Sequence, residues 1–215
     1  MEGVKVIFDL DGTLVDSAPD IHAAVNAMLV NEGQPPMTLA QVVSYVGNGL
    51  PRLVERVMDA RGIDMARHLT LTRATLAHYT NGPKLTRCYP GVPEALQALA
   101  QAGHSLGICT NKPEGPALSV LHDLGLARFF GVVVGGDRLL VTKPDPAPLL
   151  LCLQELGGGD AIFVGDSEVD AETAQSAGLP FLLFTQGYRK GPVETLLHRA
   201  AFADFARLPG LVDAA

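Results

Sequence analysis

The sequence predicts an α/β fold in which a parallel-sheet core is interrupted by an all-helical insertion. An apolar run at residues 4–8 ends abruptly at the turn signal Asp-Leu-Asp-Gly, as a buried strand followed by a loop does. Residues 15–85 then show helical spacing without a strand pattern, and residues 86–215 alternate between helix and strand. Such alternation is typical of a parallel sheet with helices on both faces.

The core domain is expected at residues 1–14 and 86–215. Short runs rich in β-branched and apolar residues predict its strands, at 4–8, 105–109, 132–134, 161–164 and 180–184. Apolar residues at helical spacing predict the helices between them, at 92–101, 117–124, 147–156 and 169–177. The last three helices each end next to a glycine, which favours termination there.

Residues 15–85 are expected to form a second domain that is entirely helical. Gly33 ends its first helix, and a second helix begins near Thr38. The segment Val46-Gly47-Asn48-Gly49 interrupts the helical pattern, and a last helix is expected at 65–79.

The composition favours a globular cytoplasmic protein. Apolar residues make up 47% of 215 residues, which is enough for a large core. The net charge is −7 without a cluster of basic residues, which argues against a nucleic-acid partner. No apolar run approaches the roughly 18 residues of a membrane span. The acidic N-terminus is unlike a signal peptide, and three scattered cysteines favour neither disulfides nor zinc. We expect a monomer or homodimer.

Polar residues follow the predicted strands at the points where ligands bind in parallel sheets, beyond the carboxyl ends. They are Asp9 and Asp11 after the first strand, Thr110, Asn111 and Lys112 after the second, Lys143 beyond the third, and Asp166 with Asp170 after the fourth. Each alone has an ordinary explanation as a turn, a helix cap or a surface charge. Their common position favours one site.

These residue types suit a magnesium site that transfers a phosphoryl group. The side chains of Asp9 and Asp11 project to the same side of an extended chain, and two carboxylates so close repel each other without a cation. Mg²⁺ prefers such oxygen ligands, and Asp166 adds a third, with Asp170 in support one helical turn later. Lys143 and Thr110 would neutralise charge on the phosphoryl oxygens, together with N–H groups around Gly12.

The motifs resemble those of the haloacid dehalogenase superfamily. Four segments match in order: Asp9-Leu10-Asp11-Gly12-Thr13, Cys109-Thr110-Asn111-Lys112, Lys143-Pro144-Asp145-Pro146 and Val164-Gly165-Asp166-Ser167 with Asp170. Within the superfamily the chain is most similar to the phosphoglycolate phosphatases, on the segments Val46-Gly47-Asn48-Gly49, Tyr89-Pro90-Gly91-Val92, Thr110-Asn111-Lys112-Pro113 and Gly135-Gly136-Asp137.

The resemblance implies a Rossmann-like core with a helical cap and a Mg²⁺-dependent phosphatase. Asp9 would be the nucleophile and Asp11 the general acid–base. Asp9, Asp166 and the backbone carbonyl of Asp11 would hold Mg²⁺, while Thr110 and Lys143 would bind the phosphoryl group. The dehalogenases and phosphonate-cleaving relatives lack an acid at the position of Asp11, which favours ester hydrolysis or phosphomutase chemistry.

The expected substrate is 2-phosphoglycolate, hydrolysed to glycolate and phosphate. The residues expected to contact it are Gly12, Thr13, Gly47, Asn48, Gly49, Arg52, Asn111 and Lys112. In the helical domain, the two glycines permit close approach to a ligand, and the helix that follows them could bind the glycolate carboxylate at its N-terminus.

Three alternatives remain open at this point. The same core would serve another small-sugar phosphatase or a phosphomutase. A phospho-receiver signalling module also uses an aspartate, Mg²⁺, a Thr or Ser and a Lys, but its aspartate lies deeper in the chain and it has no helical insertion. A binder that has lost catalysis would be expected to lack one of the motif residues.

Overall fold

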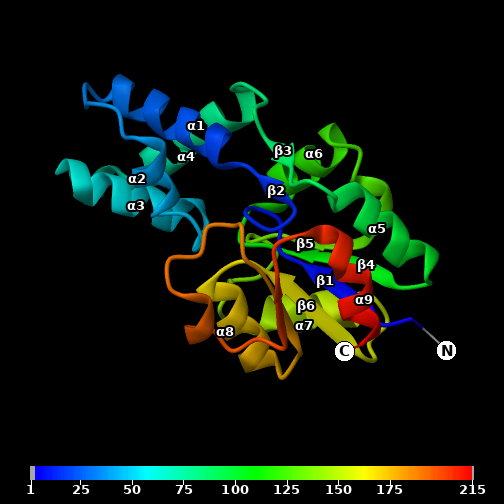
Figure 1. Ribbon diagram of the computed structural model, residues 1–215. Helices are drawn as coiled ribbons and strands as arrows, with labels where there is room; N and C mark the ends of the chain where they lie inside the picture. Colours follow the sequence, from blue (N-terminus) through cyan, green and yellow to red (C-terminus); the bar gives the residue numbers. More distant parts are fainter. Residues whose placement is uncertain (1–2, 215) are drawn as a thin grey trace. The chain divides into compact units, whose positions relative to one another are not determined.

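A computed structural model describes residues 3–214 of the chain (Figure 1). The chain forms two compact units: the core unit, residues up to Asp16 with those from Cys88 onward, and the helical unit, Ser17–Arg87. Each junction lies two residues later than the boundaries expected from the sequence. No helix within residues 3–214 combines the length and apolar character needed to cross a membrane.

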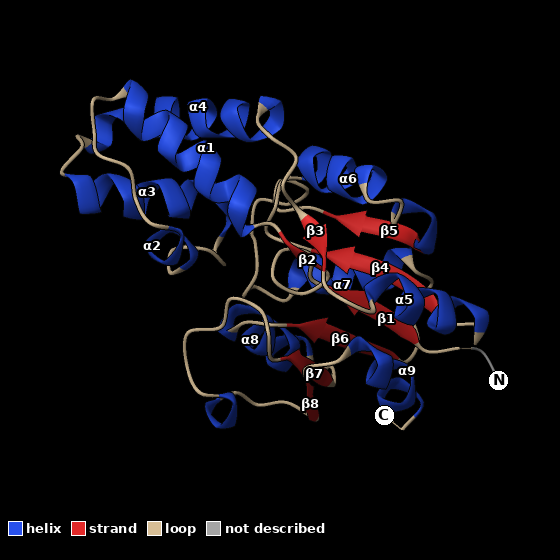
Figure 2. Ribbon diagram, turned by 45° about the horizontal axis from the view of Figure 1, so that its top comes forward, coloured by secondary structure: helices blue, strands red, loops and turns tan. Residues whose placement is uncertain are grey.

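The core unit is built on a six-stranded sheet in the order β5-β4-β1-β6-β7-β8, with parallel pairing throughout (Figure 2). The strands are β1 (Lys5–Phe8), β4 (Ser105–Cys109), β5 (Phe130–Val134), β6 (Ala161–Gly165), β7 (Phe181–Phe184) and β8 (Ala200–Phe202). The predicted parallel α/β core is confirmed. The first strand of the chain lies inside the sheet, paired on both sides.

Helices cover both faces of this sheet (Figure 2). Their bounds are α5 (Val92–Gln101), α6 (Glu114–Asp123), α7 (Ala147–Glu155), α8 (Glu168–Ala177) and α9 (Leu208–Asp213). Because side chains alternate along a strand, Val6 and Phe8 face one apolar cluster and Ile7 faces the other. The first cluster includes residues of α5, α6 and α9, and the second includes residues of α7 and α8.

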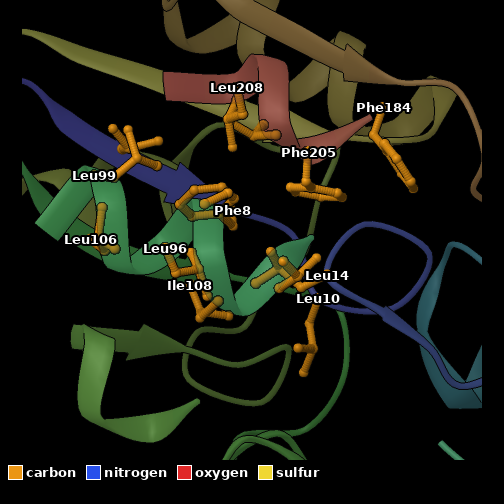
Figure 3. Packing of buried hydrophobic residues seen from close by; sticks show 14 of the residues in the cluster. Phe8, Leu10, Leu14, Leu96, Leu99, Leu106, Ile108, Phe184, Phe205 and Leu208 are labelled. Atoms are coloured by element: carbon orange, nitrogen blue, oxygen red, sulfur yellow. The ribbon is translucent and has the colours of Figure 1, made fainter. Parts of the chain in front are cut away.

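The apolar cluster around Phe8 anchors the strand that carries the candidate nucleophile (Figure 3). Phe8 is fully buried and meets Phe130 edge to face, with ring centroids 6.2 Å apart. Truncating such a buried aromatic side chain to alanine typically costs about 3–5 kcal/mol. The sheet therefore holds the residue that follows Phe8 on a rigid support.

The end of the chain contributes two elements that the sequence does not predict, β8 and α9. Phe202 of β8 packs on Phe184 and Phe205, with ring centroids 5.5 and 5.3 Å away. Leu208 of α9 is fully buried in the same cluster. These elements are three and six residues long, too short for a periodic pattern.

The helical unit contains α1 (Ala18–Asn31), α2 (Leu39–Val43), α3 (Gly49–Arg61), the 3₁₀ turn η1 (Met65–Arg67) and α4 (His68–Asn81). Thr38 caps α2 in a reciprocal pair with Gln41. An apolar cluster of its own, including Val25, Met28 and Val54, packs these helices together. The last helix begins three residues later than expected, because Asp64 caps the η1 turn that precedes it.

Two-residue strands mark the junctions between the units. They are β2 (Val15–Asp16) and β3 (Arg87–Cys88), which pair in a separate two-stranded sheet. Neither is predicted from the sequence, because two residues carry no alternation.

Candidate active site

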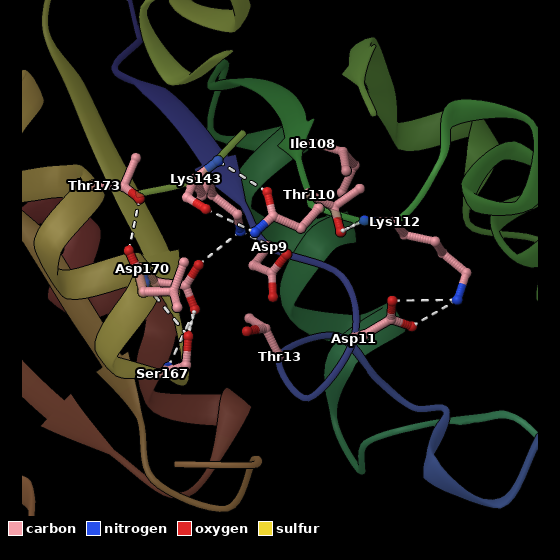
Figure 4. Close-up of polar contacts among 12 residues, drawn as sticks. Asp9, Asp11, Thr13, Ile108, Thr110, Lys112, Lys143, Ser167, Asp170 and Thr173 are labelled. Atoms are coloured by element: carbon pink, nitrogen blue, oxygen red, sulfur yellow. Dashed lines mark hydrogen bonds and ion pairs between the residues drawn. The ribbon is translucent and has the colours of Figure 1, made fainter. Parts of the chain in front are cut away.

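The candidate site lies at the carboxyl edge of the core sheet, and Figure 4 shows its polar side chains. Two backbone hydrogen bonds continue the ladder of the sheet beyond the strand ends. The N–H of Asp9, just after β1, donates to the carbonyl of Val164 at 2.9 Å. The N–H of Thr110, just after β4, donates to the carbonyl of Val134 at 3.0 Å. The first residues of both loops therefore hold positions set by the sheet.

Lys143 is the central cation of the site. Its Nζ lies 2.8 Å from Oδ1 of Asp9 and 2.7 Å from Oδ1 of Asp170, and the residue is 3% exposed. Burial alone would lower the pKa of Lys143, but the negative charges of Asp170 and Asp9 outweigh it and raise the pKa. Lys143 therefore carries its charge throughout the neutral range.

Asn111 fixes the backbone of Lys143. Its Nδ2 donates to the Lys143 carbonyl at 2.9 Å, and its Oδ1 accepts from the Lys143 N–H at 2.9 Å. The sequence places Asn111 among the substrate-contacting residues. In the structure both ends of its amide bind Lys143, which gives Asn111 a positioning role.

Three buried carboxylates gather around this lysine. Asp9, Asp166 and Asp170 each offer an oxygen, and these oxygens lie within 4.8 Å of one another. Burial raises the pKa of Asp9 to about 6, against the attraction of Lys143, and the charge of Asp170 adds to the rise. Burial, with repulsion from Asp170 and Asp9, raises the pKa of Asp166 well above its usual value.

This donor set fits a magnesium ion. When all three carboxylates are ionised against one ammonium, they leave two excess negative charges in a buried space, which a divalent cation would balance. All the donors are hard oxygens, the type that Mg²⁺ prefers. Asp9 and Asp166 would hold the ion.

Asp170 supports the site through both of its oxygens. While Oδ1 pairs with Lys143, Oδ2 accepts from the hydroxyl of Ser167 at 2.6 Å and from the N–H groups of Ser167 and Asp166. These contacts hold the loop after β6. They agree with a supporting role for Asp170 rather than with direct ligation.

Gly12 and Thr13, in the loop after β1, lie beside Asp166. Thr13 is fully buried and its hydroxyl donates to Oδ1 of Asp166 at 2.8 Å. The N–H of Gly12 donates to the Val15 carbonyl, and that of Thr13 to the Leu10 carbonyl. These two N–H groups are therefore used within the turn, and the contact of Gly12 and Thr13 with the substrate stays a prediction.

Asp11 points to a different partner. Its Oδ1 and Oδ2 lie 3.0 and 3.2 Å from Nζ of Lys112, and its side chain is outside the group of carboxylate oxygens formed by Asp9, Asp166 and Asp170. Figure 4 shows this pair beside the cluster around Asp9. The sequence predicts both residues for the site but not their pairing.

A fifth strand end contributes to the site and is missed by the sequence analysis. After β7, the N–H of Tyr188 donates to Oδ2 of Asp166 at 2.6 Å, and its hydroxyl donates to Asp16 at 2.8 Å. A Cβ on Gly187 would lie 2.3 Å from the same Asp166 oxygen, so only glycine fits without a shift. The strand-end rule could have found this segment, because Gln186-Gly187-Tyr188 follows the predicted strand at 180–184.

The candidate residues of the helical unit lie at the start of α3 or just before it, and the described side-chain contacts of Asn48 and Arg52 are with residues of that unit. Gly47 and Gly49 have φ values of +124° and +80°, a conformation that favours glycine. Oδ1 of Asn48 accepts from Arg56 at 2.8 Å, and Arg56 also donates to the Tyr45 carbonyl. Arg52 pairs with Glu55 and its side chain is 59% exposed.

Comparison with known proteins agrees with this geometry. The sequence model of the haloacid dehalogenase-like hydrolases matches residues 6–184. A phosphoglycolate phosphatase of Cereibacter sphaeroides is 49% identical over 210 residues, which cover 96% of each chain. One from Rhodospirillum rubrum is 46% identical over 212 residues, covering 94% of this chain and 88% of that protein.

Among solved structures, a crystal structure titled as a predicted phosphoglycolate phosphatase from Haemophilus somnus superposes with a TM-score of 0.92. It shares 31% identity, and the match covers 98% of each chain. The resemblance carried by the four sequence motifs is confirmed over the length of the chain. The chain therefore belongs to the haloacid dehalogenase-like hydrolase family.

Proposed function

We propose that this protein is a Mg²⁺-dependent phosphatase that hydrolyses 2-phosphoglycolate to glycolate and phosphate through a phosphorylated Asp9. The observation that carries the proposal is the position of Asp9. It lies at the end of a central strand, 2.8 Å from Lys143 and beside Asp166 and Asp170. The names of the relatives at 49% and 46% identity support the choice of substrate.

The reaction proceeds in two displacements. In the first, a carboxylate oxygen of Asp9 forms a bond to phosphorus while the ester P–O bond breaks, and Asp11 gives a proton to the departing oxygen. In the second, water attacks the phosphorus of the aspartyl phosphate and Asp11 takes the proton from this water. Inorganic phosphate leaves, and Asp9 and Asp11 return to their starting states.

The surrounding residues supply positive charge and orientation. Lys143 and the hydroxyl of Thr110 bind the phosphoryl oxygens, where charge is spread in the transition state. Asp9, Asp166 and the backbone carbonyl of Asp11 would hold Mg²⁺, which supplies further charge neutralisation when bound. Thr13, Asn111 and Asp170 keep these groups in place.

The nucleophile is tested with Asp9→Asn, which keeps the size of the side chain. The rate of phosphate release from 2-phosphoglycolate should fall by more than about a hundredfold, because the covalent route is lost. When the reaction is quenched with acid, a substrate radiolabelled in its phosphoryl group should leave covalently bound label on the wild-type protein and none on the variant. Asp160→Asn, at the amino end of β6, is the matched control and should keep both activity and label.

The substrate is tested with a panel of phosphate monoesters. 2-Phosphoglycolate should exceed glucose phosphates in kcat/KM by more than about tenfold, and excess EDTA should abolish turnover. A preference for a hexose phosphate would support the alternative of a sugar phosphatase. Interconversion of sugar phosphates without release of phosphate would instead indicate a phosphomutase.

A further inference from the structure

The loop after β5 carries the segment Gly135-Gly136-Asp137, which has no part in the proposed reaction. This segment lies against the loop after β4. The N–H of Gly136 donates to the carbonyl of Lys112 at 2.8 Å, and Oδ1 of Asp137 accepts from the N–H of Glu114 at 2.8 Å. The loop after β4 is therefore held at two points by the neighbouring loop.

The two loops approach so closely that only glycine fits between them. A Cβ on Gly135 would lie 2.4 Å from the backbone nitrogen of Glu114. A Cβ on Gly136 would lie 2.4 Å from the carbonyl oxygen of Asn111. Both obstructing atoms belong to the backbone, so no side-chain rotation makes room for the added carbon. Neither glycine has a positive φ, so close packing rather than backbone conformation requires glycine here.

Asp137 caps α6 from outside the helix. The residue before this helix is Pro113, whose side chain makes no capping hydrogen bond. N–H groups in the first turn of a helix have no partner within the helix, and a carboxylate beside them is further favoured by the helix dipole. The contact of Asp137 with the N–H of Glu114 therefore fixes the start of α6, where the loop after β4 ends.

The loop after β5 is also fastened to the loop after β4 further along the chain. Asn111 binds both the N–H and the carbonyl of Lys143, at 2.9 Å each. The segment from Gly136 to Lys143 is thus held at both ends by residues 111–112. Because Thr110 belongs to one loop and Lys143 to the other, these contacts set the distance between the two groups proposed to bind the phosphoryl oxygens.

We propose that Gly135, Gly136 and Asp137 are positioning residues of the phosphoryl-binding site. They hold the loop of Thr110 against the loop of Lys143, so that both side chains reach the oxygens of one phosphoryl group. This inference rests on the proposed function, which gives Thr110 and Lys143 that task. A misplacement of about 1 Å can cost about a hundredfold in rate, so a small separation of the two loops has a measurable effect.

The test measures KM for 2-phosphoglycolate and the inhibition constant of inorganic phosphate, a product that occupies the phosphoryl site alone. Gly136→Ala should raise both by about tenfold or more, because the added Cβ forces the two loops apart. Asp137→Ala should raise both by a smaller factor, about threefold, because one of the two contacts remains. Asp137→Asn keeps an oxygen acceptor and should restore most of the wild-type affinity. Asp137 is exposed, so its variants give the answer even if Gly136→Ala does not fold.

Gly115→Ala is the matched control, since Gly115 lies in the first turn of α6 and a Cβ added there meets open space. It should keep the wild-type inhibition constant. A purely structural role of the segment would lower the free energy of unfolding and the amount of folded enzyme, but not the affinity of the molecules that stay folded. An unchanged KM and inhibition constant in Gly136→Ala and Asp137→Ala would therefore overturn the inference. A wild type that hydrolyses no phosphate monoester would overturn the proposed function instead.

Discussion

The proposed role of Asp11 as general acid can be tested by itself, because the benefit of a general acid depends on how readily the leaving group departs without a proton. An alkoxide such as glycolate leaves poorly without a proton, whereas para-nitrophenolate leaves readily. Asp11→Asn should therefore slow hydrolysis of 2-phosphoglycolate by about 10²–10⁴-fold and that of para-nitrophenyl phosphate much less.

Steady-state kcat for the two substrates measures this difference. The same substitution also removes the charge that faces Lys112. A purely structural effect of losing that ion pair would slow both substrates by the same factor, and this outcome would contradict the acid role.

Single residues also mark the limit of what the sequence reveals. The strand-end rule finds Asp9, Thr110, Lys143 and Asp166, because each follows a strand in the linear chain. It does not reveal that Asn111 holds the backbone of Lys143, 32 residues away. Contacts of this kind depend on the tertiary arrangement of two loops, which the local sequence does not predict.

The loop after β7 shows how a whole segment supports the proposed metal site. Tyr188 donates to Asp166 from its backbone, and Glu168 at the start of α8 accepts from the N–H groups of Lys190 and Gly191. The N–H groups of this segment thus bind two carboxylates, that of Asp166 and that of Glu168, and the second contact fixes the segment to the start of α8. The backbone of the segment has little freedom to move away from Asp166.

Gly187→Ala should consequently disturb metal binding. The new Cβ would lie 2.3 Å from both an Asp166 oxygen and the Gly12 carbonyl, so the segment or Asp166 must shift. We expect the Mg²⁺ concentration for half-maximal activity to rise by about tenfold or more, comparable with other losses of support around a metal ligand. A magnesium titration of phosphatase activity measures it.

Gly210→Ala in α9 is the matched control, since no atom lies within 4 Å of its added Cβ. It should leave the magnesium requirement unchanged and stabilise the protein slightly, by about 0.4–1 kcal/mol. Equal magnesium titrations for wild type and Gly187→Ala would mean that the segment does not constrain Asp166.

At the scale of the elements, length decides what the sequence can predict. The five strands and the helices between them are long enough for periodicity and carry glycine or turn signals at their ends. β2, β3 and β8 have two or three residues each, and their pairing comes from tertiary contacts. The aromatic contacts of Phe202 with Phe184 and Phe205 define β8 only after the chain has folded.

For the whole molecule, the excess negative charge of the site links metal binding to stability. An ion that binds the folded state and not the unfolded chain adds free energy in proportion to the logarithm of its concentration. Mg²⁺ at a hundred times its dissociation constant should raise the free energy of unfolding by about 2.7 kcal/mol. Urea unfolding at constant ionic strength and increasing Mg²⁺ measures the effect.

Asp166→Ala provides the comparison, because it removes one of the two proposed carboxylate ligands and its charge. This variant should show little dependence of stability on Mg²⁺. The same stabilisation in variant and wild type would mean that the ion acts elsewhere on the protein.

The central place of β1 also has a consequence for how the protein is made. Lys5 pairs with Ser105 on one side and with Ala161 on the other, so β1 cannot complete its pairing until both later strands have been synthesised. Pairings so distant in sequence slow folding, since a long loop has to close before each one forms. A nascent chain that has not yet reached Asp166 carries the proposed nucleophile without its carboxylate partners, and phosphatase activity can arise only after that point of translation.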